Sequence, residues 1–297
     1  MNYLIKKITT ATNQILFFIV DAVYYIKNKN PDETTLLEID DLKVEEGKDG
    51  KWDGFEADIL KKFKTQKNNK NFLRFKGYGE LVHPNQQKLA LKIYKKLKGT
   101  DLIKKEKISI DKFGKPQRFW LNPDTSPQRI IHLYNIFVFR SLLESITKKS
   151  PPTEGKINYI TEFGAGFGGS TISLHSNFAN AKIKRIDLPV MLKIQDWYFE
   201  NTNQKHLIEN SHEREGISLF WATWSLSECA LTIRQRYEEL IERHDIVFIT
   251  FQRDWFEIEN LKYFKLLSKR LKKTHIVEIK ELPEYPGNYA LIAMRPQ

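Results

Sequence analysis

The fold is decided by residues 159–171, which read YITEFGAGFGGST. In this stretch an apolar run reaches Gly164, Gly166, Gly168 and Gly169, and residues compatible with a helix follow. Strand, glycine loop and helix is the order in which an α/β domain presents its backbone to a nucleotide-like ligand. Glycine reaches positive φ and has no Cβ, so a ligand can approach the main chain closely. We therefore predict a ligand-binding loop here rather than a plain turn.

Two ligand classes fit the spacing of these glycines. Gly164, Gly166 and Gly169 satisfy G-x-G-x-x-G, the dinucleotide pattern. Glu162, Gly164, Gly166 and Gly168 satisfy E-x-G-x-G-x-G, which resembles the first motif of class I S-adenosylmethionine-dependent methyltransferases. Because the spacing alone does not separate the two ligands, the order of the later elements has to decide between them.

The composition is that of an ordinary globular protein. The chain has 297 residues, of which 41% are hydrophobic and 29% charged, enough for one large domain or a core with an added module. Cys229 is the single cysteine, which excludes an internal disulfide and suits a reducing cytoplasm, the location we expect. The net charge of +11 comes from lysines spread along the whole chain. Since no nucleic-acid-binding motif accompanies them, we expect a solvated surface and no nucleic-acid partner.

The amino terminus carries an amphipathic pattern at residues 3–27, where apolar residues recur at helical spacing. Its longest apolar run, residues 15–20, is far shorter than the roughly 20 residues that a membrane-spanning helix needs. The flanking lysines permit peripheral contact with a membrane. We favour a helix that packs on its own protein or on a second subunit of a homo-oligomer.

From residue 157 the pattern alternates strands with helices, which predicts a parallel sheet with right-handed crossovers. The last two strands are joined by a short loop and should form an antiparallel hairpin. A seven-stranded, mostly parallel sheet that ends in such a hairpin resembles the Rossmann-like fold of class I methyltransferases, whereas a dinucleotide-binding half would end with another crossover helix. The predicted strands are 157–163, 183–188, a weak one near 206–209, 217–222, 245–250, 275–281 and 289–294.

A domain boundary is predicted just before Ser126-Pro127, where an N-cap residue precedes a proline at the first helical position. We expect residues 126–297 to form the Rossmann-like domain that binds S-adenosylmethionine. Residues 1–125 are expected to form a mainly helical module that covers the site and selects the acceptor.

Two carboxylates are candidate ligand contacts. Asp187 lies at the end of the second strand, 23 residues after Gly164, where a carboxylate can accept the ribose hydroxyls of an adenosine. Glu162 lies in an otherwise apolar strand, where a charge is costly unless a ligand amino group or backbone N–H groups partner it. Further along, Ser225 and Glu228 have the S-x-x-E spacing of a capping box for the helix that follows them.

Four segments together resemble one family, the sugar O-methyltransferases associated with bacterial surface-polysaccharide loci. The resemblance runs from about residue 127 to the end of the chain and is weak before residue 120. The segments are TEFGAGFGGST (161–171), RIDLPVM (185–191), FWATWSLSE (220–228) and ITFQRDWFEIEN (249–260).

The resemblance implies an S-adenosylmethionine-dependent O-methyltransferase that acts on a sugar hydroxyl of a bacterial glycan or activated sugar, a class that includes lipid- and nucleotide-linked acceptors. It places the cofactor on the glycine loop and the aspartate of the DLP motif, and it places the meeting point of cofactor and acceptor at the ATWSLSE segment. The residues that we assign to the cofactor are Glu162, Gly164, Ala165, Gly166, Gly168, Asp187, Leu188, Thr223 and Trp224.

Methyl transfer to an alcohol needs a group that takes the hydroxyl proton. His83, in an aromatic and glycine-containing loop just before Pro84, is our first candidate, and Glu228 is the second. His132 has the pattern of a core residue in a buried helix. No carboxylate pair is specific enough to assign a metal site. Two other functions remain open, a nicotinamide-dependent oxidoreductase and a non-catalytic binding protein on the same fold.

Overall fold

The structure is a computed structural model, and it describes most of the chain from residue 51 onward. The predicted helix at residues 3–27 and the candidate base His83 lie outside the described residues. The described ranges are 51–65, 69–74, 87–105, 113–147, 154–208 and 216–296.

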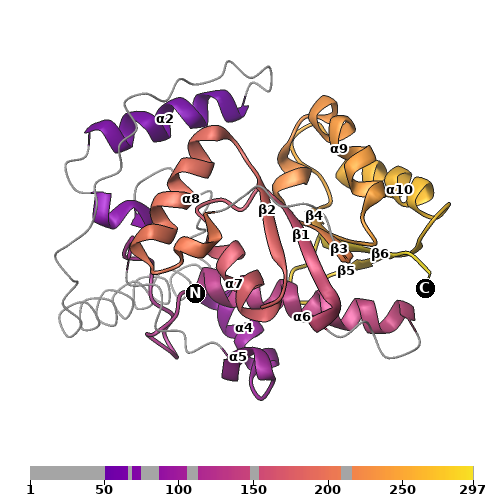
Figure 1. The fold of residues 1–297 in the computed structure, drawn as a ribbon, viewed down its shortest axis with the longest axis horizontal. Helices are drawn as coiled ribbons and strands as arrows, with labels where there is room; N and C mark the ends of the chain where they lie inside the picture. Colours follow the sequence, from indigo (N-terminus) through magenta and orange to yellow (C-terminus); the bar gives the residue numbers. More distant parts are fainter. Residues whose placement is uncertain are drawn as a thin grey trace, which may run out of the picture.

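One sheet forms the centre of the molecule (Figure 1), and its six strands lie in the order β2-β1-β3-β4-β6-β5. Strands β1 to β4 are parallel, whereas β6 is antiparallel to both of its neighbours, β4 and β5. The predicted terminal hairpin is therefore confirmed, and with it the Rossmann-like α/β fold of class I methyltransferases. The strands are β1 (Ile157–Phe163), β2 (Lys182–Ile186), β3 (Ile217–Thr223), β4 (Ile246–Gln252), β5 (Ile276–Glu281) and β6 (Asn288–Met294).

The prediction of seven strands is wrong for the described part of the chain. The weak strand expected near residues 206–209 is replaced at residues 205–207 by a short 3-10 helix, η3. Its backbone N–H groups bond locally, from Leu207 to Gln204 at 2.8 Å and from Ile208 to Lys205 at 3.1 Å. Groups that close local turns cannot also pair with the edge strand β2.

Helices cover both faces of the sheet (Figure 1). On one face α4, α6 and α7 share a hydrophobic core with the sheet, and α9 and α10 form a second core on the opposite face. The helices are α2 (Lys51–Thr65), η1 (Asn69–Arg74), α4 (Gln87–Leu97), α5 (Asp101–Lys105), α6 (Pro127–Thr147), η2 (Glu154–Lys156), α7 (Gly169–Asn177), α8 (Pro189–Asn201), η3 (Lys205–Leu207), η4 (Ser225–Glu228), α9 (Leu231–Arg243) and α10 (Asn260–Leu271).

The sequence explains which strands are central. Strands β3, β4 and β6 are apolar along almost their whole length and are buried on both faces, as expected for strands covered by helices on each side. The edge strand β2 instead alternates exposed Lys182 and Lys184 with buried Ile183. Charged side chains on an edge strand protect it from pairing with another chain.

The described part of the amino-terminal region packs on α8 through a third hydrophobic cluster. From this region α2, η1 and Phe113 contribute aromatic and aliphatic side chains. Phe72 of η1 lies 5.3 Å from Trp197 of α8 and 6.3 Å from Phe167 of the glycine loop, measured between ring centroids. The amino-terminal region therefore contacts the glycine loop directly.

A second contact joins the amino-terminal region to the terminal hairpin. Glu284, in the loop between β5 and β6, forms an ion pair of 2.5 Å with Lys96 of α4 and accepts a hydrogen bond from the Tyr134 hydroxyl of α6. Lys92 of α4 donates to the backbone oxygen of Pro283 at 3.2 Å. These contacts hold the hairpin loop against α4 and α6.

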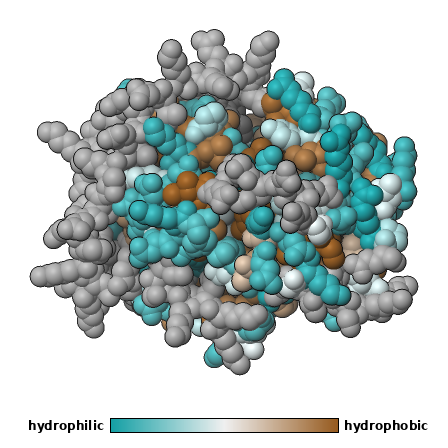
Figure 2. Space-filling view, viewed as in Figure 1, coloured by the Kyte–Doolittle hydropathy of each residue, from teal (hydrophilic) through white to brown (hydrophobic). Residues whose placement is uncertain are grey.

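The coloured surface in Figure 2 is mainly hydrophilic, with small hydrophobic patches between polar side chains. Within the described ranges, none of the helices combines the length and the apolar character needed to cross a bilayer.

Candidate functional site

The glycine loop connects β1 to α7 at the carboxyl edge of the sheet. Gly164, Gly166 and Gly168 have φ values of +72°, +60° and +98°, in the region that favours glycine. A Cβ on Gly164 would lie 2.2 Å from the Ser225 side chain, and one on Gly168 would lie 2.7 Å from the Phe199 ring. A Cβ on Gly166 would meet no atom of the described residues within 4 Å. Gly164 and Gly168 thus have no room for a side chain, whereas the space beside Gly166 is open in the described part of the chain.

Glu162 is a buried carboxylate beside this loop, with 1% of its surface exposed. Its Oε2 accepts a hydrogen bond of 2.6 Å from the Thr171 hydroxyl of α7. Its Oε1 has no hydrogen-bond partner among the described residues. Burial raises the pKa of Glu162, opposed by the hydroxyls of Ser170 and Thr171 and by the positive charge of Arg185. A buried acceptor without a partner calls for a donor, and the described residues supply none to Oε1.

Asp187 follows β2 at the same edge. Its Oδ1 accepts the backbone N–H of Leu188 at 2.9 Å, and its Oδ2 accepts the Gln195 side-chain amide at 2.8 Å. Burial raises its pKa to about 7, the Glu162 charge adds to this, and hydrogen bonds from Leu188, Gln195 and the Gly166 backbone oppose it. The carboxylate therefore changes charge near neutral pH.

Gln195 of α8, which sequence reasoning missed, links these groups. Its Nε2 donates to Asp187 and also, at 2.8 Å, to the backbone oxygen of Gly166, while its Oε1 accepts from Arg185. The sequence signal that could have identified Gln195 is a side-chain amide on the helix face that also carries the buried Met191 and Tyr198. Such a side chain needs internal partners.

The predicted ATWSLSE residues lie next to the glycine loop. Thr223 ends β3, and the Ser225 hydroxyl donates to the backbone oxygen of Phe163 at 2.5 Å. The predicted capping box is wrong, because Ser225 and Glu228 form the separate 3-10 helix η4 and α9 begins only at Leu231, without a side-chain cap.

Trp224 has an unusual backbone for a large side chain, with φ +63°. Its Nε1 donates to Asn288 Oδ1 at 2.8 Å, and its ring lies 5.5 Å from that of Tyr285 in the hairpin loop. The indole is thus in contact with the terminal hairpin. A non-glycine residue in this conformation carries strain, which is concentrated at functional sites.

The structure brings most of the predicted cofactor residues together at one edge. Glu162, the loop residues Gly164 to Gly168, Asp187 and Leu188 lie where β1 and β2 end, with Gly164 N–H donating to Ile186 O at 2.8 Å. Thr223 and Trp224 adjoin this group through Ser225. Whether these residues bind a cofactor stays a prediction, and so does the role of Glu228, which is half-buried in η4.

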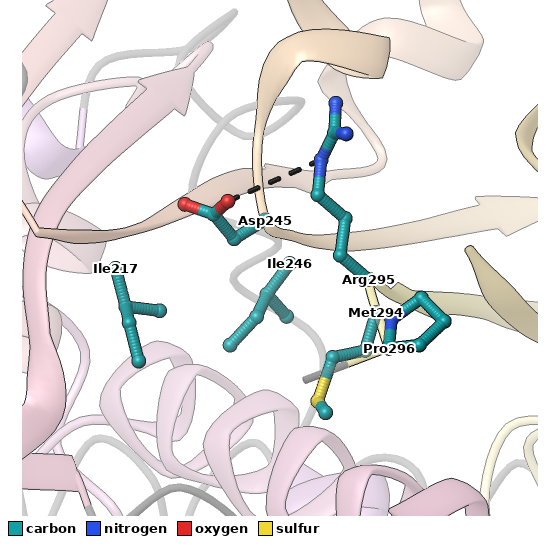
Figure 3. Close-up of a pocket in the computed structure, with 6 residues that line it drawn as sticks. All are labelled: Ile217, Asp245, Ile246, Met294, Arg295 and Pro296. Atoms are coloured by element: carbon teal, nitrogen blue, oxygen red, sulfur yellow. Dashed lines mark ion pairs between the residues drawn. The ribbon is translucent and has the colours of Figure 1, made fainter. Parts of the chain in front are cut away.

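A cavity of about 210 Å³ lies elsewhere, at the amino edge of the sheet (Figure 3). Asp245 and Arg295 both line it and form an ion pair, with 4.0 Å between Oδ1 and Nε. Asp245 Oδ2 also accepts from the backbone and hydroxyl of Ser218, at 2.9 and 2.6 Å, and Arg295 donates to the Glu242 backbone oxygen at 2.8 Å. The polar groups of this cavity already have partners within the protein.

Neither a family model nor a curated protein matches the chain. Solved structures that match include the small RNA methyltransferase HEN1, with 11% identity, a TM-score of 0.37 and coverage of 55% of this chain and 25% of that one. A SAM-dependent methyltransferase from Aquifex aeolicus matches at 15% identity and TM-score 0.36, over 56% of this chain and 98% of the other.

An O-methyltransferase family protein from Burkholderia thailandensis is 8% identical with a TM-score of 0.37, over 71% of this chain and 70% of that one. This chain therefore spans a quarter of HEN1 and most of the two bacterial proteins. Likeness at this level does not identify a reaction, so the function has to be argued from the geometry of the site.

Proposed function

We propose that the protein binds S-adenosylmethionine at the carboxyl edge of the sheet and transfers its methyl group. The observation that carries this is the buried Glu162, whose Oε1 has no partner among the described residues, next to the open backbone of Gly166. The antiparallel β6 supports a methyltransferase over a nicotinamide-dependent oxidoreductase, which would continue with another crossover unit.

The residues present fit this cofactor. Glu162 would bind its ammonium group, because a cation offsets the cost of a buried carboxylate. Asp187 would accept the two ribose hydroxyls, and the backbone at Gly166 would lie against the ligand. Ala165, Gly168 and Leu188 would complete the binding surface. When bound, S-adenosylmethionine supplies an electrophilic methyl group on a sulfonium.

For the acceptor we propose a sugar hydroxyl of a bacterial glycan or activated sugar, on the basis of the motif resemblance. Methyl transfer to such a hydroxyl would need a base of this chain to take the hydroxyl proton. His83 is our proposed base, with Glu228 as the alternative. A neutral imidazole is a suitable proton acceptor at pH 7. Thr223, which ends β3, and Trp224, which follows it, border the place where cofactor and acceptor would meet.

We also propose that residues 1–125 cover the site and select the acceptor. Support comes from the packing of Phe72 on Phe167 in the glycine loop and from the contacts of Lys92 and Lys96 with the hairpin loop that carries Tyr285. Deletion of residues 1–125 should abolish methyl transfer. Transfer to the native acceptor by the truncated chain would contradict this role.

The cofactor assignment is tested by ligand-dependent thermal unfolding. S-adenosylhomocysteine at about a hundredfold excess over its dissociation constant should add roughly 2.7 kcal/mol to the free energy of unfolding. NAD at the same concentration should leave the unfolding temperature unchanged. Stabilisation by NAD alone would overturn the methyltransferase proposal, and stabilisation by neither ligand would favour the non-catalytic alternative.

A further inference from the structure

Gln195 is an uncharged polar side chain with no exposed surface. It lies on α8 next to the buried Ile194, and Tyr198 follows on the same side of the helix. A buried amide is costly unless its donors and its acceptor are all used. Its contacts therefore show what keeps it in the core.

Each polar atom of this amide has a partner. The two hydrogens on Nε2 serve two acceptors, Gly166 O and Asp187 Oδ2, both at 2.8 Å. Oε1 accepts from Arg185 Nη1 at 3.2 Å. Because a guanidinium donates and never accepts, the amide oxygen must face Arg185 and the nitrogen must face the loop.

Arg185 is itself held in place. Its Nη1 pairs with Asp196 Oδ1 at 2.9 Å, and its Nη2 donates to the Ile208 backbone oxygen at 2.9 Å. The guanidinium also lies 5.1 Å from the Phe199 ring centroid. A fixed cation therefore fixes the orientation of the Gln195 amide, which in turn contacts both halves of the proposed cofactor site.

We propose that Gln195 is a positioning residue that holds the glycine loop at Gly166 and the carboxylate of Asp187 in one arrangement, ready for the adenosine part of the cofactor. This inference rests on the proposed function and extends it to a residue that touches no cofactor. It also makes cofactor binding depend on the protonation of Asp187, since only the carboxylate accepts both ribose hydroxyls.

The groups facing Asp187 determine the direction of the pH effect. Burial and the charge of Glu162 disfavour the ionised carboxylate, and the N–H groups of Leu188, Gln195 and Gly166 favour it. Removal of the Gln195 donor should raise the pKa of Asp187 further. Affinity should then fall most at neutral and slightly acidic pH, and should recover as the pH rises.

The test compares the native protein with Gln195→Met, which keeps the size of the side chain and removes its hydrogen bonds. The dissociation constant of S-adenosylhomocysteine is measured by calorimetry between about pH 6 and about pH 9. Ionisation of the ligand affects both proteins equally, so it cancels in the ratio of the two dissociation constants at each pH. We expect affinity about tenfold weaker at pH 7, as for the loss of a hydrogen bond to a charged group, and a smaller ratio at pH 9. Gln235→Met, on the exposed side of α9, is the matched control and should behave as native.

An unchanged affinity in folded Gln195→Met would overturn the inference, and so would an equal loss at every pH, which indicates a structural role only. If Gln195→Met does not fold, the same measurement is made on Gln195→Glu and judged by the same criteria. This variant keeps an acceptor for Arg185 and lacks the donors to Gly166 and Asp187. Failure of the native protein to bind S-adenosylhomocysteine would instead refute the proposed function, so that the two failures are distinguishable.

Discussion

The two edges of the sheet each carry a carboxylate near an arginine, yet they differ in how their polar groups are satisfied. At the amino edge Asp245 and Arg295 border a cavity of about 210 Å³, and each has internal hydrogen-bond partners. At the carboxyl edge the loop around Gly166 is open and Glu162 Oε1 has no partner among the described residues. A buried group without a partner identifies a binding site better than an empty volume does.

The largest loss of cofactor binding should come from Gly166→Val. A β-branched side chain at φ +60° would project into the space that the ligand needs. We expect no detectable S-adenosylhomocysteine binding by calorimetry. Gly287→Val is the matched control, because Gly287 lies in the hairpin loop, also has positive φ (+77°) and has no described residue within 4 Å of where its Cβ would be. Equal losses in both variants would attribute the effect to backbone strain.

Glu162→Gln should separate stability from binding. Burial raises the pKa of Glu162, so the folded state holds its proton more tightly than the unfolded chain, whose glutamate pKa is about 4.3. The stability that the protonated Glu162 contributes is fully present below the unfolded-state pKa, and it is lost as the pH rises through the higher folded-state pKa. At pH 8 the ligand-free variant should therefore be more stable, by on the order of 1 kcal/mol, yet bind S-adenosylhomocysteine about ten- to a hundredfold more weakly.

For this prediction Glu239→Gln is the matched control, because Glu239 is exposed on α9 and pairs with Arg243. A variant at Glu162 that binds as tightly as the native protein would mean that the carboxylate does not meet the ligand. A variant that loses stability at pH 8 would mean that the contacts of the carboxylate with Thr171 and Arg185 outweigh the cost of burying its charge.

Asp187 should make binding of the native protein depend on pH. With a pKa of about 7, the carboxylate is protonated at lower pH and can no longer accept both ribose hydroxyls. The dissociation constant should be about tenfold larger at pH 6 than at pH 8. Asp187→Asn should bind more weakly at pH 8 and show a flat profile. A profile that keeps its slope in this variant would assign the titration to another group.

The smallest effect on binding is expected at the amino edge. Asp245→Asn weakens the two hydrogen bonds that Asp245 accepts from Ser218 and should lower the free energy of unfolding by about 1 kcal/mol. The affinity for S-adenosylhomocysteine should not change. A change in this affinity of more than a few-fold would mean that the amino edge contributes to ligand binding, which contradicts the contrast between the two edges.

Local signals in the sequence predicted most of the fold. The glycines of the loop, Pro189 at the start of α8 and the short connection before β6 each act through the backbone of their own segment, so the pattern alone identified the loop, Asp187 and the terminal hairpin. The position of Glu162 followed from a charge within an apolar strand.

The remaining features depend on contacts between distant segments. Gln195 resembles any polar residue on a helix until Gly166 and Arg185 are placed beside it. Ser225 matched a capping box by spacing, but its hydroxyl bonds to Phe163 on another strand. Residues 206–209 had weak strand character that local turn bonds of η3 override. Spacing in the chain contains no information about these partners.

Phe167 connects the glycine loop to η1 of the amino-terminal region. Its ring belongs to the loop, yet it packs on Phe72 at 6.3 Å and on Tyr198 at 5.2 Å. A ligand that restricts the loop therefore also restricts η1, which lies outside the proposed binding surface. Backbone amides of residues 69–74 should then exchange with deuterium more slowly in the liganded protein, so this short helix would report occupancy from a distance.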